Sequence, residues 1–481
     1  MNEATLHYAL AHADDDVRQL ALQGCRDAAV DLPLALQQIS GRQAARIKVP
    51  SWAARDGILY PPHLSMEQCS SETTARYKAQ IASPTPPTPP NTPCSPSGPS
   101  SPSTPSGPTT PPPPYRKLVD LTGGFGVDFA FMCEHYDEGI YVERNAELCA
   151  IAHHNFQELG LRQASVVNAE AETFLHHLEE HVTTIVVDPA RRDTHGARTY
   201  GISDCTPNVL PLMDELLSKS DHVLLKLSPM LDWRKAVSDV GPQHVEQVHI
   251  VAVGGECKEL LLWLSEKGCS EPRLYASDLS PNNPNNPNNL SNLSPKERGV
   301  VSFAIDSLTP DPSPKERGVV SFAIDKTGKG NIKEESIYPP LLGRGVGGEV
   351  GEVGEVVEVE ESPSFLYEPH AALMKAGLFT ELAQRYGVSA LAPNSHLFVS
   401  DTLVDAFPGR SFHIDAISTM NKQELKEKVL PLKQANISVR NFPMSADALR
   451  KKLKLSEGGS TYLFASTLAD GRHVIFVCHK A

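Results

Sequence analysis

Six short apolar runs separated by helix-like stretches occupy the middle of the chain, and they constrain its fold more than any other feature. The runs are rich in Val, Leu and Ile and span 117–121, 139–142, 164–167, 184–187, 222–227 and 245–253. Strands that alternate with helices in this way form a parallel sheet with helices on both faces. The sequence therefore predicts a doubly wound α/β domain at residues 115–278.

Two segments of biased composition interrupt the chain. Residues 83–114 are mainly Pro, Ser and Thr, which predicts an extended, disordered linker. Residues 279–362 contain Asn-Pro repeats, a duplicated string SPKERGVVSFAID and a Glu-rich end, which predicts a disordered low-complexity insert. The chain before the linker, residues 1–82, has helical spacing with Asp31 and Ser70 or Ser71 as caps, so we expect an N-terminal helical domain there.

Globular patterning returns after the insert. The spacing predicts a helix over 368–386, a second helix over 446–453, and a final hairpin that pairs 461–467 with 473–478.

The composition of the chain indicates the cellular compartment that we expect and whether we expect a metal site. The chain contains no apolar window long enough to cross a membrane, and it opens with neither a basic nor an apolar stretch. Its nine cysteines are scattered and never spaced C-x-x-C, and its histidines are dispersed. We therefore expect a cytoplasmic protein with reduced thiols, no metal site and no membrane partner.

The strongest motif is the glycine-rich turn Asp120-Leu121-Thr122-Gly123-Gly124-Phe125-Gly126, which follows the first predicted strand. Its glycines allow a ligand to approach the backbone, and an acid at a strand end can accept hydrogen bonds from the ligand. Glu143 ends the second strand, where an acid can bind ribose hydroxyls. Asn168 and Glu170 follow the third strand, where an adenine amine would lie. The series predicts a cofactor that contains a nucleoside.

The fourth run ends in Asp188-Pro189-Ala190-Arg191, which places a carboxylate in the ligand crevice of an open sheet. A dinucleotide fingerprint fails because Phe129 stands where its third glycine would be. A carboxylate beside a backbone carbonyl can instead accept hydrogen bonds from an exocyclic amino group and orient it. The alternative is that Asp188 only caps the next element.

Four motifs, in this order along the chain, resemble those of class I S-adenosylmethionine-dependent methyltransferases: DLTGGFG, YVERN, VVNAEAE and VVDPARRD. Two of them, DLTGGFG and the DPAR part of VVDPARRD, resemble the forms found in enzymes that act on nucleic-acid bases. Further segments, among them ECKELLL, LYEPHAALMKAG, NFPMSADALRKKLKL and GGSTYLFAST, resemble a Bacteroidetes family of methyltransferases with ferredoxin-like and THUMP-like domains. This resemblance implies a Rossmann-like class I methyltransferase sheet, a ferredoxin-like module at 363–411 and a THUMP-like domain at 412–481, both small α+β domains.

The resemblance also implies roles for individual residues. Those expected around S-adenosylmethionine are Asp120, Thr122, Gly124, Gly126, Glu143, Asn168 and Glu170. Those expected beside the methylated group are Asp188, Pro189, Ala190 and Arg191. Thr122 departs from the general pattern, because many class I enzymes carry a glycine at this position.

A basic segment near the C-terminal end points to a polyanionic partner. Residues 422–454 hold nine Lys and Arg against three acids, in a chain whose net charge is −14. The residues expected to contact phosphates are Arg440, Arg450, Lys451, Lys452 and Lys454. The alternative is a solvated surface helix. Because THUMP modules accompany RNA-modifying enzymes, the resemblance implies a structured RNA such as tRNA or rRNA.

We therefore expect a methyltransferase that acts on RNA at an exocyclic or ring nitrogen of a base. Carbon methylation of a pyrimidine is disfavoured because it needs a cysteine nucleophile, and Lys226-Leu227-Ser228-Pro229 stands where related enzymes carry one. Two alternatives remain open, an RNA-binding protein that keeps the fold without turnover, and a methyltransferase acting on small molecules or proteins.

Overall fold

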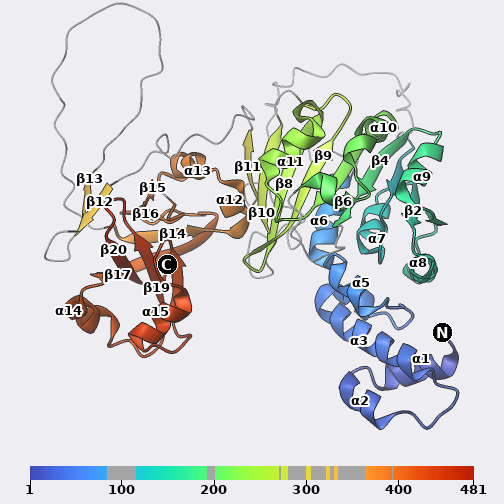
Figure 1. Ribbon diagram of the computed structural model, residues 1–481, viewed down its shortest axis with the longest axis horizontal. Coiled ribbons are helices and arrows are strands. Elements are labelled where there is room, and N and C mark those ends of the chain that lie inside the picture. Colours follow the sequence, from blue (N-terminus) through green and yellow to red (C-terminus); the bar gives the residue numbers. More distant parts are fainter. Residues whose placement is uncertain are drawn as a thin grey trace, which may run out of the picture. The chain divides into compact units, whose positions relative to one another are not determined.

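The computed structural model describes residues 1–83, 115–191, 201–269, 272–279, 300–304, 321–324, 330–333, 363–392 and 394–481. The chain divides into two compact units, Met1–Asp306 and Ser307–Ala481 (Figure 1). The predicted linker, beyond its first residue, and most of the predicted insert lie outside the described residues. Inside the insert range the structure describes three short strands, of which β12 (Ser321–Ile324) and β13 (Gly330–Lys333) pair with each other.

The first unit is built on a nine-stranded sheet with the order β11-β10-β8-β9-β7-β4-β1-β2-β3. Its strands are β1 Lys117–Asp120, β2 Glu138–Glu143, β3 Ala164–Asn168, β4 Val182–Val187, β7 Ser220–Leu227, β8 Val245–Val253, β9 Glu256–Leu264, β10 Arg273–Asp278 and β11 Val300–Ala304. Strands β3, β2, β1, β4 and β7 are parallel to one another, whereas β9 runs antiparallel to both β7 and β8. The predicted α/β class is confirmed, and the six apolar runs all form strands of this sheet.

Helices connect the parallel strands. They are α7 Val127–Cys133, α8 Ala146–Leu159, α9 Ala171–His177, α10 Met213–Ser218 and α11 Trp233–Val240. Helix α8 begins where Asn145 accepts hydrogen bonds from the backbone of Glu147 and Leu148, and it ends at Gly160 in the left-handed conformation. A two-residue strand β5 (Ala190–Arg191) follows β4 and pairs with β6 (Cys205–Thr206). This topology brings the ends of β1 to β4 to one edge of the sheet.

Six helices precede the sheet, coloured blue in Figure 1. They are α1 Glu3–Ala11, α2 Val17–Gln23, α3 Leu32–Lys48, α4 Pro50–Ala53, α5 His63–Gln68 and α6 Glu72–Ala82. Two of the predicted caps are confirmed: the carboxylate of Asp31 accepts from the Leu34 amide, and the Ser71 hydroxyl accepts from the Thr74 amide.

Helix α6 packs against α7 and joins the core of the sheet. The Tyr77 hydroxyl lies 2.9 Å from Nδ1 of His249 on β8 and 2.8 Å from the hydroxyl of Ser277 on β10. The Trp52 ring meets Phe125 of the glycine-rich turn edge-on, with centroids 5.1 Å apart. Residues 45–82 therefore share one hydrophobic core with the sheet, on the side of the glycine-rich turn.

The second unit contains a seven-stranded sheet with the order β15-β16-β14-β17-β20-β19-β18. Its strands are β14 Phe365–Pro369, β15 Ser389–Ala390, β16 Phe398–Ser400, β17 Gly409–Thr419, β18 Asn436–Arg440, β19 Thr461–Thr467 and β20 His473–Lys480. Its helices are α12 Ala371–Ala376, α13 Phe379–Tyr386, α14 Lys422–Glu424 with a π-helical turn Leu425–Val429, and α15 Ala446–Leu453.

The predictions for this unit hold in part. The helix over 446–453 and the hairpin of β19 and β20 are confirmed. The single helix over 368–386 is wrong, because Glu368 belongs to β14 and Gly377 adopts φ +73° between α12 and α13. A residue in this left-handed conformation ends an α-helix.

Among the described residues, no helix is both long enough and apolar enough to span a bilayer.

Candidate active site

The glycine-rich turn after β1 is closed against the sheet on one side and open on the other. Gly124 and Gly126 adopt φ +57° and +86°, which favours glycine. A Cβ on Gly123 would lie 2.1 Å from the Tyr141 ring, so this residue must lack a side chain. A Cβ on Gly124 would have no neighbour closer than the Thr122 carbonyl oxygen at 3.9 Å. The space beside Gly124 is therefore free for a ligand.

Glu143 at the end of β2 lies against this turn. Its Oε2 accepts a hydrogen bond from the Gly124 amide at 3.0 Å, and its Oε1 accepts one from the Asn145 amide at 2.8 Å. A carboxylate oxygen has two lone pairs, so each oxygen can accept a second hydrogen bond from a ligand hydroxyl. The predicted neighbourhood of Glu143 and the turn is thus present in the structure.

Asn168 links the ends of two strands, and its predicted place beside an adenine amine stays a prediction. Its amide Nδ2 donates to the backbone carbonyls of Glu143 at 2.8 Å and Arg144 at 2.9 Å, which joins the ends of β2 and β3. Its amide donors are therefore engaged within the protein. Glu170 precedes α9 with an exposed side chain.

Asp120 is a buried acid at the end of β1, and its Oδ1 accepts from the Thr122 amide at 3.0 Å. The pKa of Asp120 is raised to about 7, mainly by burial and also by the Asp128 and Asp188 carboxylates, while the Thr122 amide and Lys226 act in the opposite direction. This carboxyl group gains or loses its charge near neutral pH, so a cationic group bound beside it would favour the ionised form.

Thr122 connects the glycine-rich turn to the residues after β4. Its Oγ1 accepts a hydrogen bond from the backbone amide of Asp188 at 2.7 Å. A glycine at position 122 could not form this bond, which gives a physical reason for the departure from the usual pattern. Beyond Asp188, Pro189 is buried and Ala190 is exposed, whereas the Arg191 side chain lies outside what the structure describes.

Lys226 on β7 is the site residue that the sequence analysis missed. Its Nζ lies 2.5 Å from Oδ2 of Asp188, whose side chain is 42 % exposed while that of Lys226 is 13 % exposed. Burial alone would lower the pKa of Lys226, but the carboxylates of Asp188, Asp128 and Glu259 outweigh it and hold the pKa above its usual value. The sequence feature that could have identified Lys226 as a site residue was the presence of a lysine among the leucines of a predicted strand.

The pair of Lys226 and Asp188 belongs to a larger group of charges, which we call the buried charge cluster. Its members are Lys78, Asp128, Asp188, Lys226 and Glu259. The Nζ of Lys78, on α6, lies 2.6 and 2.7 Å from the two Glu259 oxygens and 3.2 Å from Oδ1 of Asp128. Lys226 Nζ also lies 3.4 Å from Oδ2 of Asp128.

With its members ionised, the buried charge cluster carries three carboxylates and two ammonium groups. Burial would raise the pKa of Asp128, yet Lys78 and Lys226 hold it below its usual value. The excess negative charge, to which Asp120 adds when ionised, favours a cationic ligand at this edge of the sheet.

The residues that were predicted to contact phosphates lie in the second unit, and their side chains have different surroundings. Arg440 binds Oε1 of the buried Glu368, with Nη2 at 2.8 Å, and Arg450 binds Asp447 at 2.8 Å. Lys451, Lys452 and Lys454 have exposed side chains. The two arginines are therefore engaged by acids, and the three lysines offer the accessible charge.

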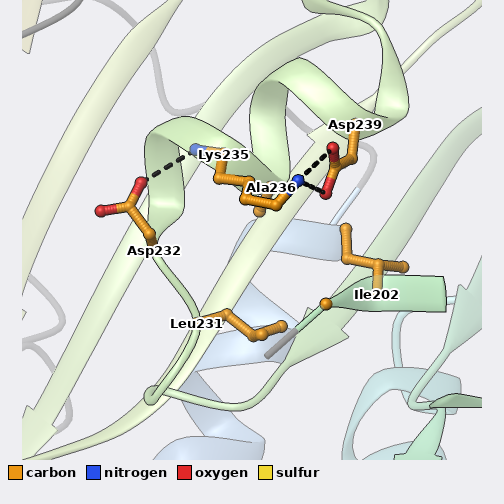
Figure 2. A pocket seen from close by; sticks show the side chains of 7 residues that line it. Ile202, Leu231, Asp232, Lys235, Ala236 and Asp239 are labelled. Carbon is orange, nitrogen blue, oxygen red and sulfur yellow. Dashed lines mark hydrogen bonds and ion pairs between the residues drawn. The ribbon is translucent and has the colours of Figure 1, made fainter. Parts of the chain in front are cut away.

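A small hollow lies elsewhere in the first unit, beside the start of α11 (Figure 2). It is lined by Ile202, Leu231 and Asp232, and by the ion pair of Lys235 with Asp239 at 2.9 Å. None of the predicted site residues lines it.

Two family models match the second unit. A ferredoxin-like domain matches residues 365–408, and a THUMP domain-like family matches residues 409–480. A search of curated proteins finds no match.

Solved structures match nearly the whole chain or about a third of it. A Porphyromonas gingivalis W83 protein, provisionally described as a methyltransferase, is 29 % identical; the match covers 99 % of this chain and 98 % of that chain with a TM-score of 0.71. An rRNA methylase from Streptococcus thermophilus is 13 % identical over 32 % of this chain and 89 % of that one, with a TM-score of 0.25. M. capricolum TrmK in complex with S-adenosyl-homocysteine is 10 % identical over 32 % of this chain and 63 % of that one, also with a TM-score of 0.25.

Proposed function

We propose that this chain, which has the fold of a class I methyltransferase followed by ferredoxin-like and THUMP-like domains, methylates a base nitrogen in RNA with S-adenosylmethionine as the methyl donor. The observation that carries the proposal is the position of the Asp188 carboxylate, held by Lys226 and tied through Thr122 to the glycine-rich turn. The expected resemblance to this methyltransferase class is confirmed, and the reaction and its substrate are our proposal.

The residues around the turn fit this cofactor. The open space beside Gly124 can admit its methionine part, and Glu143 can accept hydrogen bonds from ribose hydroxyls. Asp120 and the excess negative charge favour the sulfonium and ammonium groups, which are both cationic. When bound, S-adenosylmethionine supplies an electrophilic methyl group.

Asp188 would orient the acceptor. Lys226 binds Oδ2 of Asp188, and the pKa of this lysine lies above its usual value because of the carboxylates around it. An ionised carboxylate only accepts hydrogen bonds, so its Oδ1 can bind a target amino group and direct the nitrogen lone pair away from the carboxylate. Positioning of this kind can account for much of a rate enhancement.

The test compares modified nucleosides by mass spectrometry in RNA from a deletion strain and from its parent. We expect one methylated nucleoside to be lost on deletion and restored by the purified protein with S-adenosylmethionine. Unchanged RNA, together with methyl transfer to a protein or a small molecule, would contradict the proposal. Binding of RNA without any turnover would favour the alternative of an inactive RNA-binding protein.

Glu143→Ala is expected to weaken S-adenosylmethionine binding by about 1.5–3 kcal/mol, the usual contribution of hydrogen bonds to a charged group. The variant removes both the acceptor for the ligand and the bond that holds the Gly124 amide. Isothermal titration calorimetry measures the change, with Glu147→Ala, an exposed acid on α8, as the matched control. Equal affinities of the Glu143 variant and the wild type would remove Glu143 from the cofactor site.

Lys451→Glu combined with Lys452→Glu is expected to weaken RNA binding and to reduce the slope of log affinity against log salt by about 1 for each lysine. Both side chains are exposed on α15, so the change should leave the fold intact. The control is Lys258→Glu with Lys267→Glu in the first unit, which alters the net charge equally. If both double variants bind RNA alike at every salt concentration, α15 is only a solvated surface.

A further inference from the structure

Two histidines and an aspartate converge on neighbouring strands of the second unit. They are His413 and Asp415 on β17 and His479 on β20, and one ligand atom from each lies within 4.8 Å of the others. Nδ1 of His479 lies 2.8 Å from Oδ1 of Asp415, and Nδ1 of His413 lies 3.5 Å from the same oxygen. Two imidazole nitrogens thus face one carboxylate oxygen.

The backbone places these side chains together. His413 and His479 are direct partners in the antiparallel register, and their ring centroids are 4.9 Å apart. The register shifts between Ile414 and Ala416, so Asp415 is the extra residue of a β-bulge. Bulges re-aim side chains and are over-represented beside functional sites.

One nitrogen of this group lacks a hydrogen bond. Nδ1 of His413 is shielded from solvent and forms no hydrogen bond with any residue that the structure describes. The Phe365 ring packs edge-on against the same imidazole, with centroids 5.5 Å apart. A buried nitrogen without a hydrogen-bond partner is unfavourable. A cation bound to this nitrogen and to Asp415 would supply the missing interaction.

We propose that His413, Asp415 and His479 bind a divalent transition-metal ion of the zinc type. Ligand atoms about 2.0–2.2 Å from a tetrahedral zinc ion lie roughly 3.3–3.6 Å from one another, so the 3.5 Å separation already suits an ion and the 2.8 Å separation has to widen. Two imidazoles and one carboxylate are ligands that zinc accepts, with water in the fourth position. The ion would cross-link strand β20 to strand β17. In the sheet, β17 pairs with β14 on its other side.

The sequence analysis expected no metal because the histidines are dispersed along the chain. Asp415 and His479 are 64 positions apart, and only the pairing of β17 with β20 brings them into contact. No local spacing motif could reveal such a site. The inference is independent of the proposed methyltransferase reaction.

The test titrates the full chain, freed of metal with EDTA, with Co²⁺ and then with Zn²⁺. We expect the wild type to bind one equivalent of Co²⁺ with visible absorption bands that Zn²⁺ abolishes, and Zn²⁺ to raise its melting temperature. Asp415→Asn and His479→Ala should each weaken binding at least about 10-fold and remove the Zn²⁺ effect on melting. Asp221→Asn is the matched control, because it alters the exposed His181–Asp221 pair of the first unit, whose Nε2–Oδ1 distance is 3.0 Å.

Subtracting the spectrum of Asp415→Asn from that of the wild type cancels any Co²⁺ bound by cysteines, which both proteins share. Far-UV circular dichroism in EDTA verifies that each variant is folded; if Asp415→Asn is not, His479→Gln replaces it. Equal metal affinity in the wild type and the folded ligand variants would overturn the proposal, as would the absence of binding by the wild type. The group would then be a cross-strand ion pair.

Discussion

Asp188→Ala is expected to lower the rate of methyl transfer about 100-fold or more while the affinities for S-adenosylmethionine and RNA change only a few-fold. In our proposal this carboxylate orients the acceptor nitrogen, and loss of such orientation reduces the catalytic rate rather than ground-state binding. Single-turnover kinetics on the identified RNA, with calorimetry for the two ligands, measures both parts of the expectation.

Asp214→Ala, an exposed acid on α10, serves as the control for the change of charge. Asp188→Asn adds a second comparison, because its amide oxygen can still accept a hydrogen bond but leaves Lys226 without this carboxylate. Full turnover by Asp188→Ala would show that the residues after β4 form only a structural turn. The proposed mechanism would then be wrong even if RNA remained the substrate.

Lys78→Met is expected to lower the free energy of unfolding by about 3–5 kcal/mol, the usual effect of removing one partner from a buried ion pair. The Lys78 side chain is 0 % exposed and binds both oxygens of Glu259. Without it, Glu259 remains buried without its ammonium partner, and Asp128 keeps Lys226 and the Ser70 hydroxyl. Urea unfolding of the full chain, followed by tryptophan fluorescence, measures the loss, because Trp52, Trp233 and Trp263 all lie in the first unit.

A double variant separates the ion pair from simple packing. Lys78→Met with Glu259→Leu removes both charges, and similar apolar replacements can be neutral, so it should recover much of the loss. Lys258→Met, an exposed neighbour on β9, should change the free energy of unfolding by less than about 0.5 kcal/mol. A loss of less than about 1 kcal/mol for Lys78→Met would mean that water or another group compensates the cluster.

The features that the sequence predicted well depend on residues close together in the chain. The apolar runs became strands because β-branched and leucine side chains predominate in them. Asp31 capped α3 by accepting from the amide of Leu34, three residues later in the chain. The hairpin of β19 and β20 followed from its Asp470-Gly471 turn. The glycine-rich turn and the acids at the strand ends could likewise be located from spacing alone.

The features that the sequence did not predict depend on tertiary contacts. Strand β9 was missed because Glu256 and Lys258 give its first half a polar, turn-like composition. The partners of Lys226 and Lys78 lie on other helices and strands. No local sequence pattern therefore indicates the ion pair with Asp188 or the buried charge cluster. The engagement of Arg440 by Glu368 likewise arises only when β18 approaches β14.

The pairing of Lys78 with Glu259 also has a consequence for the order in which the protein assembles during synthesis. The two residues are 181 positions apart, so α6 leaves the ribosome long before the strand that neutralises its ammonium group. At about 5–20 residues per second, the interval is roughly 10–40 s. Until β9 is made, a buried Lys78 would have the Asp128 carboxylate, at 3.2 Å, but not the two closer oxygens of Glu259. We therefore expect α6 to dock fully only after β9 has been made.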